Sequence, residues 1–234
     1  MITQRHDISG NTYQSIWDFQ TLLHDSLKIP KIETPKTQIS AKSKAKKLNH
    51  IVFCEHNNVI TFGKSASTEN LLSSEDTLRD ENIEFYKINR GGDVTYHGPG
   101  QLTGYLIVDV ELLYRDIHKY VRNIEECIIR LLELYGIKGI RREAYTGVWI
   151  SDELGARKIC AIGVHLSRWV SMHGFGFNIN TKLENFNHII PCGIQEKASS
   201  VTSLAQELGQ TQSMDKIKDQ LQIIIEDVFD MKIV

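Results

Sequence analysis

The 234-residue sequence lacks any apolar run of about 18 residues, the minimum length of a membrane-spanning helix. Its first residues, MITQRHDISGNTYQ, lack the apolar core of a secretory signal peptide. The four cysteines, Cys54, Cys127, Cys160 and Cys192, contain no CxxC pair, which disfavours a zinc knot or a redox dithiol. Free thiols in a chain of this size suit a reducing compartment. We therefore expect a cytoplasmic protein with no membrane segment and no bound metal.

An excess of charge of one sign is also missing, because 27 Lys and Arg nearly balance 29 Asp and Glu. The resulting net charge of -2 argues against a nucleic-acid-binding protein, which usually carries a basic excess. The hydrophobic content of 41% and the chain length fit one globular domain, expected over residues 1–234. Within it, a lysine-rich loop is expected at about residues 34–48. It is either a solvated run or a docking patch for an acidic partner.

Apolar spacing predicts a mixed set of helices and strands. The expected helices cover residues 15–27, 117–135, 200–209 and 214–229. The expected strands cover residues 50–56, 58–63, 83–89, 102–110, 144–150, 157–167 and 173–180, and the runs 144–150 and 157–167 form a hairpin. Residues 102–110 are apolar at both parities, which is typical of a strand buried on both faces. Since the strands cluster between helices, the sequence predicts an α/β (α+β) fold with a mixed sheet flanked by helices.

Glycine is concentrated in the segment RGGDVTYHGPGQLTGY, residues 90–105, at a density that helices and strands rarely tolerate. The spacing of Gly98, Gly100 and Gly104 fits neither the GxGxxG nor the P-loop template. One interpretation is a purely structural turn. The other is a ligand-binding wall, since bare backbone N–H groups can approach a carbonyl or an anion. The polar side chains that favour this second interpretation are Arg90, Thr95, His97 and Gln101.

Two further positions are candidates for chemistry. Lys158 opens the apolar strand segment RKICAIGVHLS, where it is either a strand-edge lysine with its ammonium in water or a catalytic amine. Cys192 lies between a proline and a glycine in the segment IIPCGI, unlike the apolar surroundings of the other cysteines. It is either an unreactive loop thiol or a nucleophile.

These three segments together resemble the lipoyl(octanoyl) transferases, the octanoyltransferases of lipoate synthesis. The first matches their signature at Arg90, Gly91, Gly92, Thr95, Tyr96, His97, Gly100, Gln101 and Tyr105. The second matches at Lys158, Ile159, Ile162, Gly163, His173, Gly174 and Asn178, and the third at the PCG loop and the segment VTSL, residues 201–204. The likeness spans about half of the chain. It departs from the family at Asn57 and Asn58, where prolines are usual, and at Lys64, where an arginine is common.

The resemblance implies the catalytic-domain fold of the biotin and lipoate protein ligases, with no cofactor. It assigns the nucleophile to Cys192 and an essential catalytic amine, which we interpret as the base, to Lys158. Substrate contacts are expected from Arg90, Gly91, Gly92, Thr95, Tyr96, His97, Gly98, Gly100, Gln101, Ala161, Ile162, Gly163, His173, Gly174 and Gly193. We hypothesise that the N–H groups of residues 91–92, 98–100 and 193 stabilise the oxyanion. The candidate liners of an acyl tunnel are Tyr96, Tyr105, Phe175 and Phe177, while His97 and His173 either brace loops or transfer protons.

The implied donor is octanoyl-acyl carrier protein. The implied acceptors are the lipoyl domains of 2-oxoacid dehydrogenase complexes and the glycine cleavage H protein, and we expect a monomer. Two alternatives stay open. One is an ATP-dependent lipoate-protein ligase, which activates its acid as an acyl-adenylate and needs no cysteine. The other is a non-catalytic acyl-binding module.

Overall fold

The computed structural model describes residues 1–33, 48–153, 155–191 and 199–234. Its α-helices are α1 (Tyr13–Glu33), α2 (Glu75–Asp80), α3 (Val110–Leu113), α4 (Ile117–Glu133), α5 (Leu204–Leu208) and α6 (Met214–Phe229). Its first strands are β1 (Ile2–Ile8), β2 (Asn49–Cys54), β3 (Val59–Phe62), β4 (Glu84–Lys87), β5 (Val94–His97) and β6 (Gln101–Ile107). The later strands are β7 (Ile140–Arg142), β8 (Tyr145–Asp152), β9 (Gly155–Ser167), β10 (Val170–Asn178), β11 (Ser199–Val201) and β12 (Lys232–Ile233). The expected lysine-rich loop lies outside the described residues except at Leu48.

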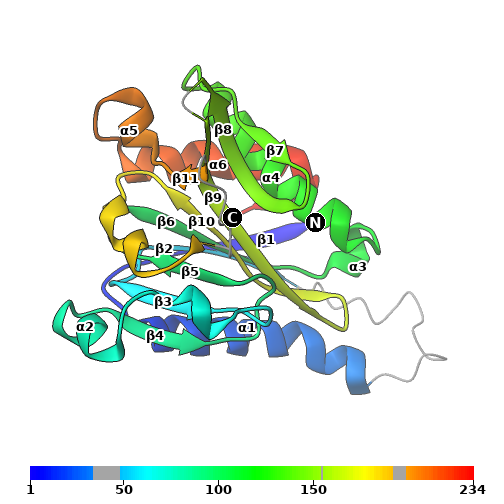
Figure 1. Cartoon of the computed structure of the whole chain (residues 1–234). Helices are drawn as coiled ribbons and strands as arrows, with labels where there is room; N and C mark the ends of the chain where they lie inside the picture. Colours follow the sequence, from blue (N-terminus) through cyan, green and yellow to red (C-terminus); the bar gives the residue numbers. More distant parts are fainter. Residues whose placement is uncertain (34–47, 154, 192–198) are drawn as a thin grey trace.

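Nine strands of the described chain form one mixed sheet, and three form a smaller one (Figure 1). The order of the large sheet is β12-β1-β2-β6-β10-β9-β8-β7, and β11 pairs with β9. The small sheet has the order β4-β3-β5. β8, β9 and β10 pair antiparallel in succession, so the hairpin predicted from residues 144–150 and 157–167 is confirmed.

The large sheet buries both faces, and the alternation of side chains along its strands separates two cores. In β2, Ile51 and Phe53 join the core that contains α4 and α6, whereas Val52 and Cys54 join the core that contains α1. Figure 1 shows α1 on one side of the sheet and α4 and α6 on the other. β6 is buried along its whole length, which confirms the interpretation of its two-sided apolar pattern.

The long helices follow the apolar periodicity, although α1 extends beyond the predicted range 15–27 at both ends. α6 has the predicted bounds and begins at Ser213, whose side chain accepts a hydrogen bond from Lys216 N–H at 3.3 Å. α4 begins at Asp116, which caps Lys119 N–H in the same way at 3.0 Å. Of the predicted helix at 200–209 only α5 is helical, because residues 199–201 pair with β9 as β11. None of the helices in the described ranges is both long and apolar enough to cross a membrane.

Five of the described strands, β1, β5, β7, β11 and β12, were not predicted from the sequence, and β5 and β1 show why. The glycine-rich segment is not a continuous bare loop, because Val94–His97 forms β5, antiparallel to β3, and Gln101 opens β6. The β-branched and aromatic residues VTY suffice for a short strand between glycines. β1 was not predicted, since its sequence ITQRHDI is mostly polar; it forms through parallel pairing with β2 and β12.

The packing of α6 predicts a contrast between two substitutions on that helix. Leu221 is fully buried in the main core, whereas Ile223 is 66% exposed. Leu221→Ala leaves a cavity and is expected to lower the free energy of unfolding by about 2 to 5 kcal/mol. Ile223→Ala should change it by no more than about 0.5 kcal/mol. Urea denaturation followed by circular dichroism measures both, and equal losses would contradict this assignment of the α6 face.

Candidate active site

A buried arginine anchors the turn between β4 and β5. The Nε and Nη2 atoms of Arg90 donate to Thr61 Oγ1 at 3.2 and 3.1 Å, and Nη2 also donates to Thr61 O at 2.6 Å. Its Nη1 donates to Gly91 O at 3.0 Å. Because a buried guanidinium is costly to leave without partners, these bonds fix the turn against β3.

The anchored turn packs directly on strand β9. Gly91 N–H donates to Val164 O at 2.9 Å, outside any regular strand ladder. A Cβ atom built at Gly163 would lie 2.7 Å from Gly91 O, so a larger residue there would push the turn away. Two of the segments singled out in the sequence, RGG and KICAIG, therefore meet through their backbones.

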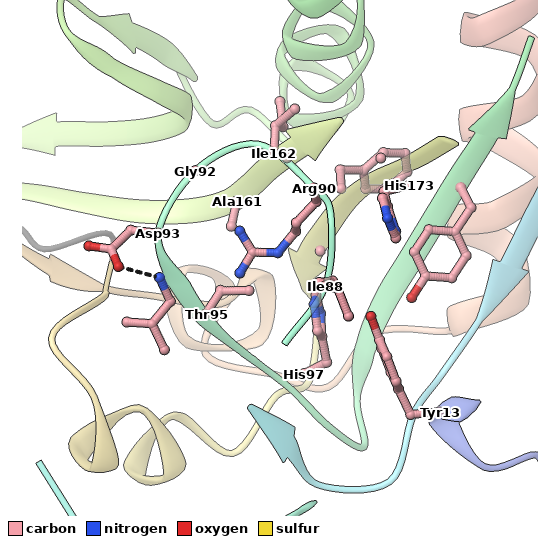
Figure 2. Close-up of a pocket in the computed structure, with 16 residues that line it drawn as sticks. Tyr13, Ile88, Arg90, Gly92, Asp93, Thr95, His97, Ala161, Ile162 and His173 are labelled. Atoms are coloured by element: carbon pink, nitrogen blue, oxygen red, sulfur yellow. Dashed lines mark hydrogen bonds between the residues drawn. The ribbon is translucent and has the colours of Figure 1, made fainter. Parts of the chain in front are cut away.

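A small cavity of about 40 Å³ lies beside this contact (Figure 2). Predicted site residues that line it are Arg90, Gly92, Thr95, His97, Ala161, Ile162, Gly163, His173 and Gly174. The expected tunnel liners Tyr105 and Phe175 also line it. The prediction omitted Tyr13, Ile88, Asp93, Val94 and Gly176. Tyr13 carries no signal of its own in the sequence, because an aromatic at the start of an amphipathic helix is typical of core.

Both predicted histidines are held by hydrogen bonds. His97 Nδ1 lies 2.6 Å from Gln101 Oε1, and His173 Nε2 lies 2.7 Å from Asn89 Oδ1. Burial, with the nearby Arg90 as a further cause, lowers the pKa of His97 to about 4 and that of His173 to about 3. Both rings are therefore neutral at physiological pH. This geometry fits the interpretation that they brace the site.

The remaining residues of the glycine-rich segment do not line this cavity. Gln101 supports His97 and donates through Nε2 to Asn178 Oδ1 at 2.9 Å. Tyr96 faces the other side of β5, where its ring packs edge-on against Phe186. Phe177 on β10, an expected tunnel liner, does not line this cavity either, because its side chain is buried in the main core.

The backbone N–H groups proposed as oxyanion donors differ in their present bonding. Gly91 N–H donates to Val164 O, as described above. Gly100 N–H donates to Glu55 Oε2 at 2.8 Å, in a turn where φ of Gly100 is +79°. Because both N–H groups already donate to acceptors within the protein, Gly91 and Gly100 are removed from the list of expected oxyanion donors.

Lys158 lies on β9 in a different, larger cavity of about 310 Å³. Lys158 is only 5% exposed, so the interpretation that it is a strand-edge lysine with its ammonium in water is wrong. The Nζ atom donates to Thr146 O at 3.2 Å and lies 4.8 Å from the centroid of the Trp149 ring. A carbonyl oxygen and an aromatic face both favour a cation, so this environment fits an ammonium held in place.

The larger cavity is also lined by Pro191 and Ser200, which lie on either side of the predicted nucleophile Cys192 in the sequence. Besides Lys158, its lining residues are Leu72, Trp149, Phe186, Asn187, Ile189, Pro191, Ser200 and Val201. Cys192 and Gly193, which follow Pro191 in the sequence, lie outside the described residues. Val201 pairs with Lys158 itself across β11 and β9.

The three cysteines within the described residues are all buried. Burial raises the pKa of the thiols of Cys54, Cys127 and Cys160. A thiol held protonated in an apolar core is a poor nucleophile. These three positions therefore do not compete with Cys192 for a role in covalent chemistry.

The architecture and the sequence both match known proteins. The lipoyl protein ligase A/B catalytic domain model matches residues 34–225. A bi-partite lipoate protein ligase from Thermoplasma acidophilum superposes with a TM-score of 0.70, covering 100% of this chain and 86% of that chain. The sequence identity of 14% in that comparison shows a common fold alone. The structural match confirms the fold class expected from the sequence.

Closer similarity is found in sequence relatives. An octanoyltransferase of Parabacteroides distasonis is 47% identical over 227 residues, covering 96% of this chain and 97% of that protein. An octanoyltransferase of Flavobacterium johnsoniae is 44% identical over 233 residues, covering 99% and 98%. This chain therefore belongs to the lipoyl protein ligase A/B catalytic-domain family and, within it, to the octanoyltransferases.

Proposed function

We propose that this octanoyltransferase takes its acyl group from octanoyl-acyl carrier protein and delivers it to a lysine of a lipoyl domain, through a thioester on Cys192. The observation that carries this mechanism is the larger cavity, where buried Lys158 and Pro191 line the same space. Lipoyl domains of 2-oxoacid dehydrogenase complexes and the glycine cleavage H protein are the proposed acceptors. We further propose that a monomer acts in the cytoplasm, where the thiol stays reduced.

In the first step, the Cys192 thiolate attacks the carbonyl carbon of the donor thioester. The ammonium of Lys158 stabilises the thiolate, because a nearby positive charge favours the ionised sulfur. The tetrahedral intermediate collapses, the bond from carbon to the donor sulfur breaks, and the leaving thiolate takes a proton from Lys158. We propose the N–H group of Gly193 as a donor to the oxyanion.

In the second step, the neutral amine of the acceptor lysine attacks the acyl-enzyme. Lys158, now neutral, takes the proton that the amine loses, and the Cys192 thiolate leaves. The products are an amide and a free carrier thiol, and the enzyme returns to its starting state. Because conversion of a thioester to an amide runs downhill, the cycle needs no ATP.

The acyl chain is proposed to lie along β9 between the two cavities. The larger cavity is about twice the size of the engineered cavity of about 150 Å³ that takes up benzene. The strand runs from Lys158 to Ala161, a lining residue of the smaller cavity, over about 10 Å. Burial of the eight-carbon chain contributes on the order of 5 kcal/mol before ordering costs are subtracted. The carbonyl would lie near Lys158 and the methyl end near the glycine-rich turn.

Incubation with octanoyl-acyl carrier protein in the absence of nucleotide tests the covalent step. Mass spectrometry of the digested protein should find one octanoyl group on the peptide that contains Cys192. The peptides of Cys54, Cys127 and Cys160 serve as internal controls and should stay unmodified. A requirement for ATP would favour the ligase mechanism instead. Full transfer activity in Cys192→Ser would remove the nucleophile from the mechanism.

Replacement of Lys158 tests the base. Lys158→Ala removes the group that stabilises the thiolate and accepts the proton, so we expect transfer to fall by about a hundredfold or more, in the range typical of general acid–base catalysis. Rates of transfer to a lipoyl domain at saturating donor measure this effect. The unfolding midpoint checks that the variant is folded. Transfer at the wild-type rate would refute the assignment.

The neutral histidines predict a pH dependence of stability. An unfolded histidine has a pKa near 6.5, so below this pH the unfolded chain gains a proton that buried His97, with a pKa of about 4, does not. Its contribution is therefore present above pH 6.5 and is lost as the pH falls toward 4. His97→Gln should reduce the slope of unfolding free energy between pH 6 and 5 by about 1.4 kcal/mol per pH unit. Urea titrations at several pH values measure the slope; equal slopes would show that His97 is not held neutral.

A further inference from the structure

A buried carboxylate lies behind the larger cavity. Glu125 lies on α4, and the side chain of Glu125 has no exposed surface. The sequence predicted only the apolar stripe of this helix. Its Oε2 accepts from Arg122 Nη1 at 2.7 Å and from Arg141 Nε at 3.1 Å. Because both arginines are partly exposed, they could be solvated without this partner. Replacing a buried ion pair by apolar residues is often neutral for stability, so pairing alone does not explain the burial of Glu125.

The second oxygen of this carboxylate reaches the strand that faces Lys158. Glu125 Oε1 accepts from the backbone N–H of Gly147 on β8 at 3.0 Å. Gly147 has φ +125°, and a Cβ atom there would lie 2.5 Å from Cys160 O and 3.4 Å from Lys158 Cε. The backbone at this point therefore takes a conformation that glycine alone adopts readily, directly against the lysine side chain.

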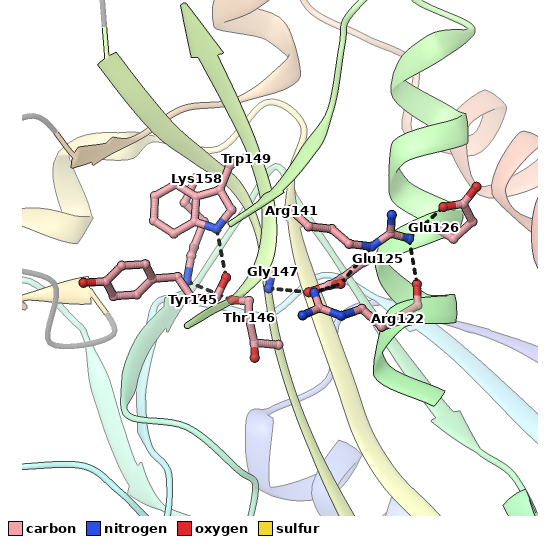
Figure 3. A network of polar contacts seen from close by, with 9 residues as sticks. All are labelled: Arg122, Glu125, Glu126, Arg141, Tyr145, Thr146, Gly147, Trp149 and Lys158. Atoms are coloured by element: carbon pink, nitrogen blue, oxygen red, sulfur yellow. Dashed lines mark hydrogen bonds and ion pairs between the residues drawn. The ribbon is translucent and has the colours of Figure 1, made fainter. Parts of the chain in front are cut away.

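One peptide unit joins the carboxylate to the lysine (Figure 3). The N–H of Gly147 and the C=O of Thr146 belong to the same planar amide, and in a trans peptide they point in opposite directions. The N–H donates to Glu125, while the C=O accepts from Lys158 Nζ at 3.2 Å. An anion on the N–H side polarises the amide and strengthens the acceptor on the other side.

The aromatic side of the lysine is fixed from the same strand. Trp149 Nε1 donates to Tyr145 O at 3.2 Å, which orients the indole ring 4.8 Å from Lys158 Nζ. Arg142 lies 4.8 Å from the same ring, so two cations flank the indole. Strand β8 therefore supplies two contacts of the ammonium, and Glu125 fixes the peptide that provides one of them.

We propose that Glu125 is a positioning residue for Lys158 and acts through the Thr146–Gly147 peptide. This inference rests on the proposed role of Lys158 as the catalytic base. The carboxylate touches neither substrate nor thiol; it sets the direction and the acceptor strength of the carbonyl that holds the ammonium.

Glu125→Gln tests this relay, and Glu126→Gln is its matched control. Glu126 is the next residue on α4 and pairs with the same Arg141, at 2.7 Å, but makes no bond to Gly147. We expect Glu125→Gln to lower kcat about tenfold with the KM for octanoyl-acyl carrier protein unchanged, since a misplacement of about 1 Å can cost a hundredfold. Glu126→Gln should retain the wild-type kcat. Equal kcat values in the two variants would overturn the proposal.

A double-mutant cycle with Lys158→Ala separates positioning from a general structural effect. If Glu125 acts through Lys158, then Glu125→Gln should cause no further loss in the Lys158→Ala background. The same fold-loss in both backgrounds would overturn the relay. A wild-type rate for Lys158→Ala alone would overturn the proposed function, and this inference with it. An impaired Lys158→Ala beside a normal Glu125→Gln would overturn the inference alone.

A second variant decides the case in which Glu125→Gln does not fold. Glu125→Asp keeps the charge for both arginines but withdraws the carboxylate from Gly147 N–H by one methylene. A folded Glu125→Asp with reduced kcat and unchanged KM supports the relay. The wild-type kcat in this variant would show that Glu125 serves folding only.

Discussion

Strand β9 is the wall that both cavities share, and its backbone contact with the glycine-rich turn sets the geometry of the site. The bond from Gly91 N–H to Val164 O and the lack of a side chain at Gly163 allow the turn to lie against the strand. Three residues before Ala161, the same strand carries Lys158 into the larger cavity. A shift of β9 relative to its neighbours would therefore displace the proposed acyl-binding wall and the amine together.

The two cavities differ in electrical character. The smaller one is lined by two histidines that burial keeps neutral, together with two charged side chains that are already bonded within the protein. Arg90 donates to Thr61 and Gly91, and the Asp93 carboxylate accepts from Asn70 and from Val94 N–H. The larger one contains an ammonium held by a carbonyl and an indole. Polar groups that are already bonded within the protein can lie beside a hydrocarbon chain, and a fixed cation suits the reacting sulfur. The proposed chemistry needs both properties within the length of one strand.

Sequence reasoning succeeded where a feature is local. α4 and α6 follow from apolar spacing, and the β8–β9 hairpin follows from two β-branched runs separated by a turn. It failed where long-range pairing decides the structure. β1 is a strand because β2 and β12 pair with it, and nothing in ITQRHDI announces those partners.

In the candidate site, too, local features were predicted and long-range contacts were not. The motif assigned Lys158 and the glycine-rich turn to one enzyme, but it did not indicate that they line separate cavities. The burial of Glu125 was also invisible, because a glutamate in an amphipathic helix is expected on the solvated face. Its partners come from α4 and from the strand region that follows it, and only the folded chain brings them together.

The order of the large sheet has a consequence for how copies of this protein meet. Its terminal strands, β12 and β7, have two and three residues, and β7 carries Arg141 and Arg142 with an irregular register against β8. Short, charged and irregular borders offer few free backbone groups in a row to an incoming strand. Such borders protect a sheet of this width from growing by addition of a second chain, even at the high concentrations of a crowded cell.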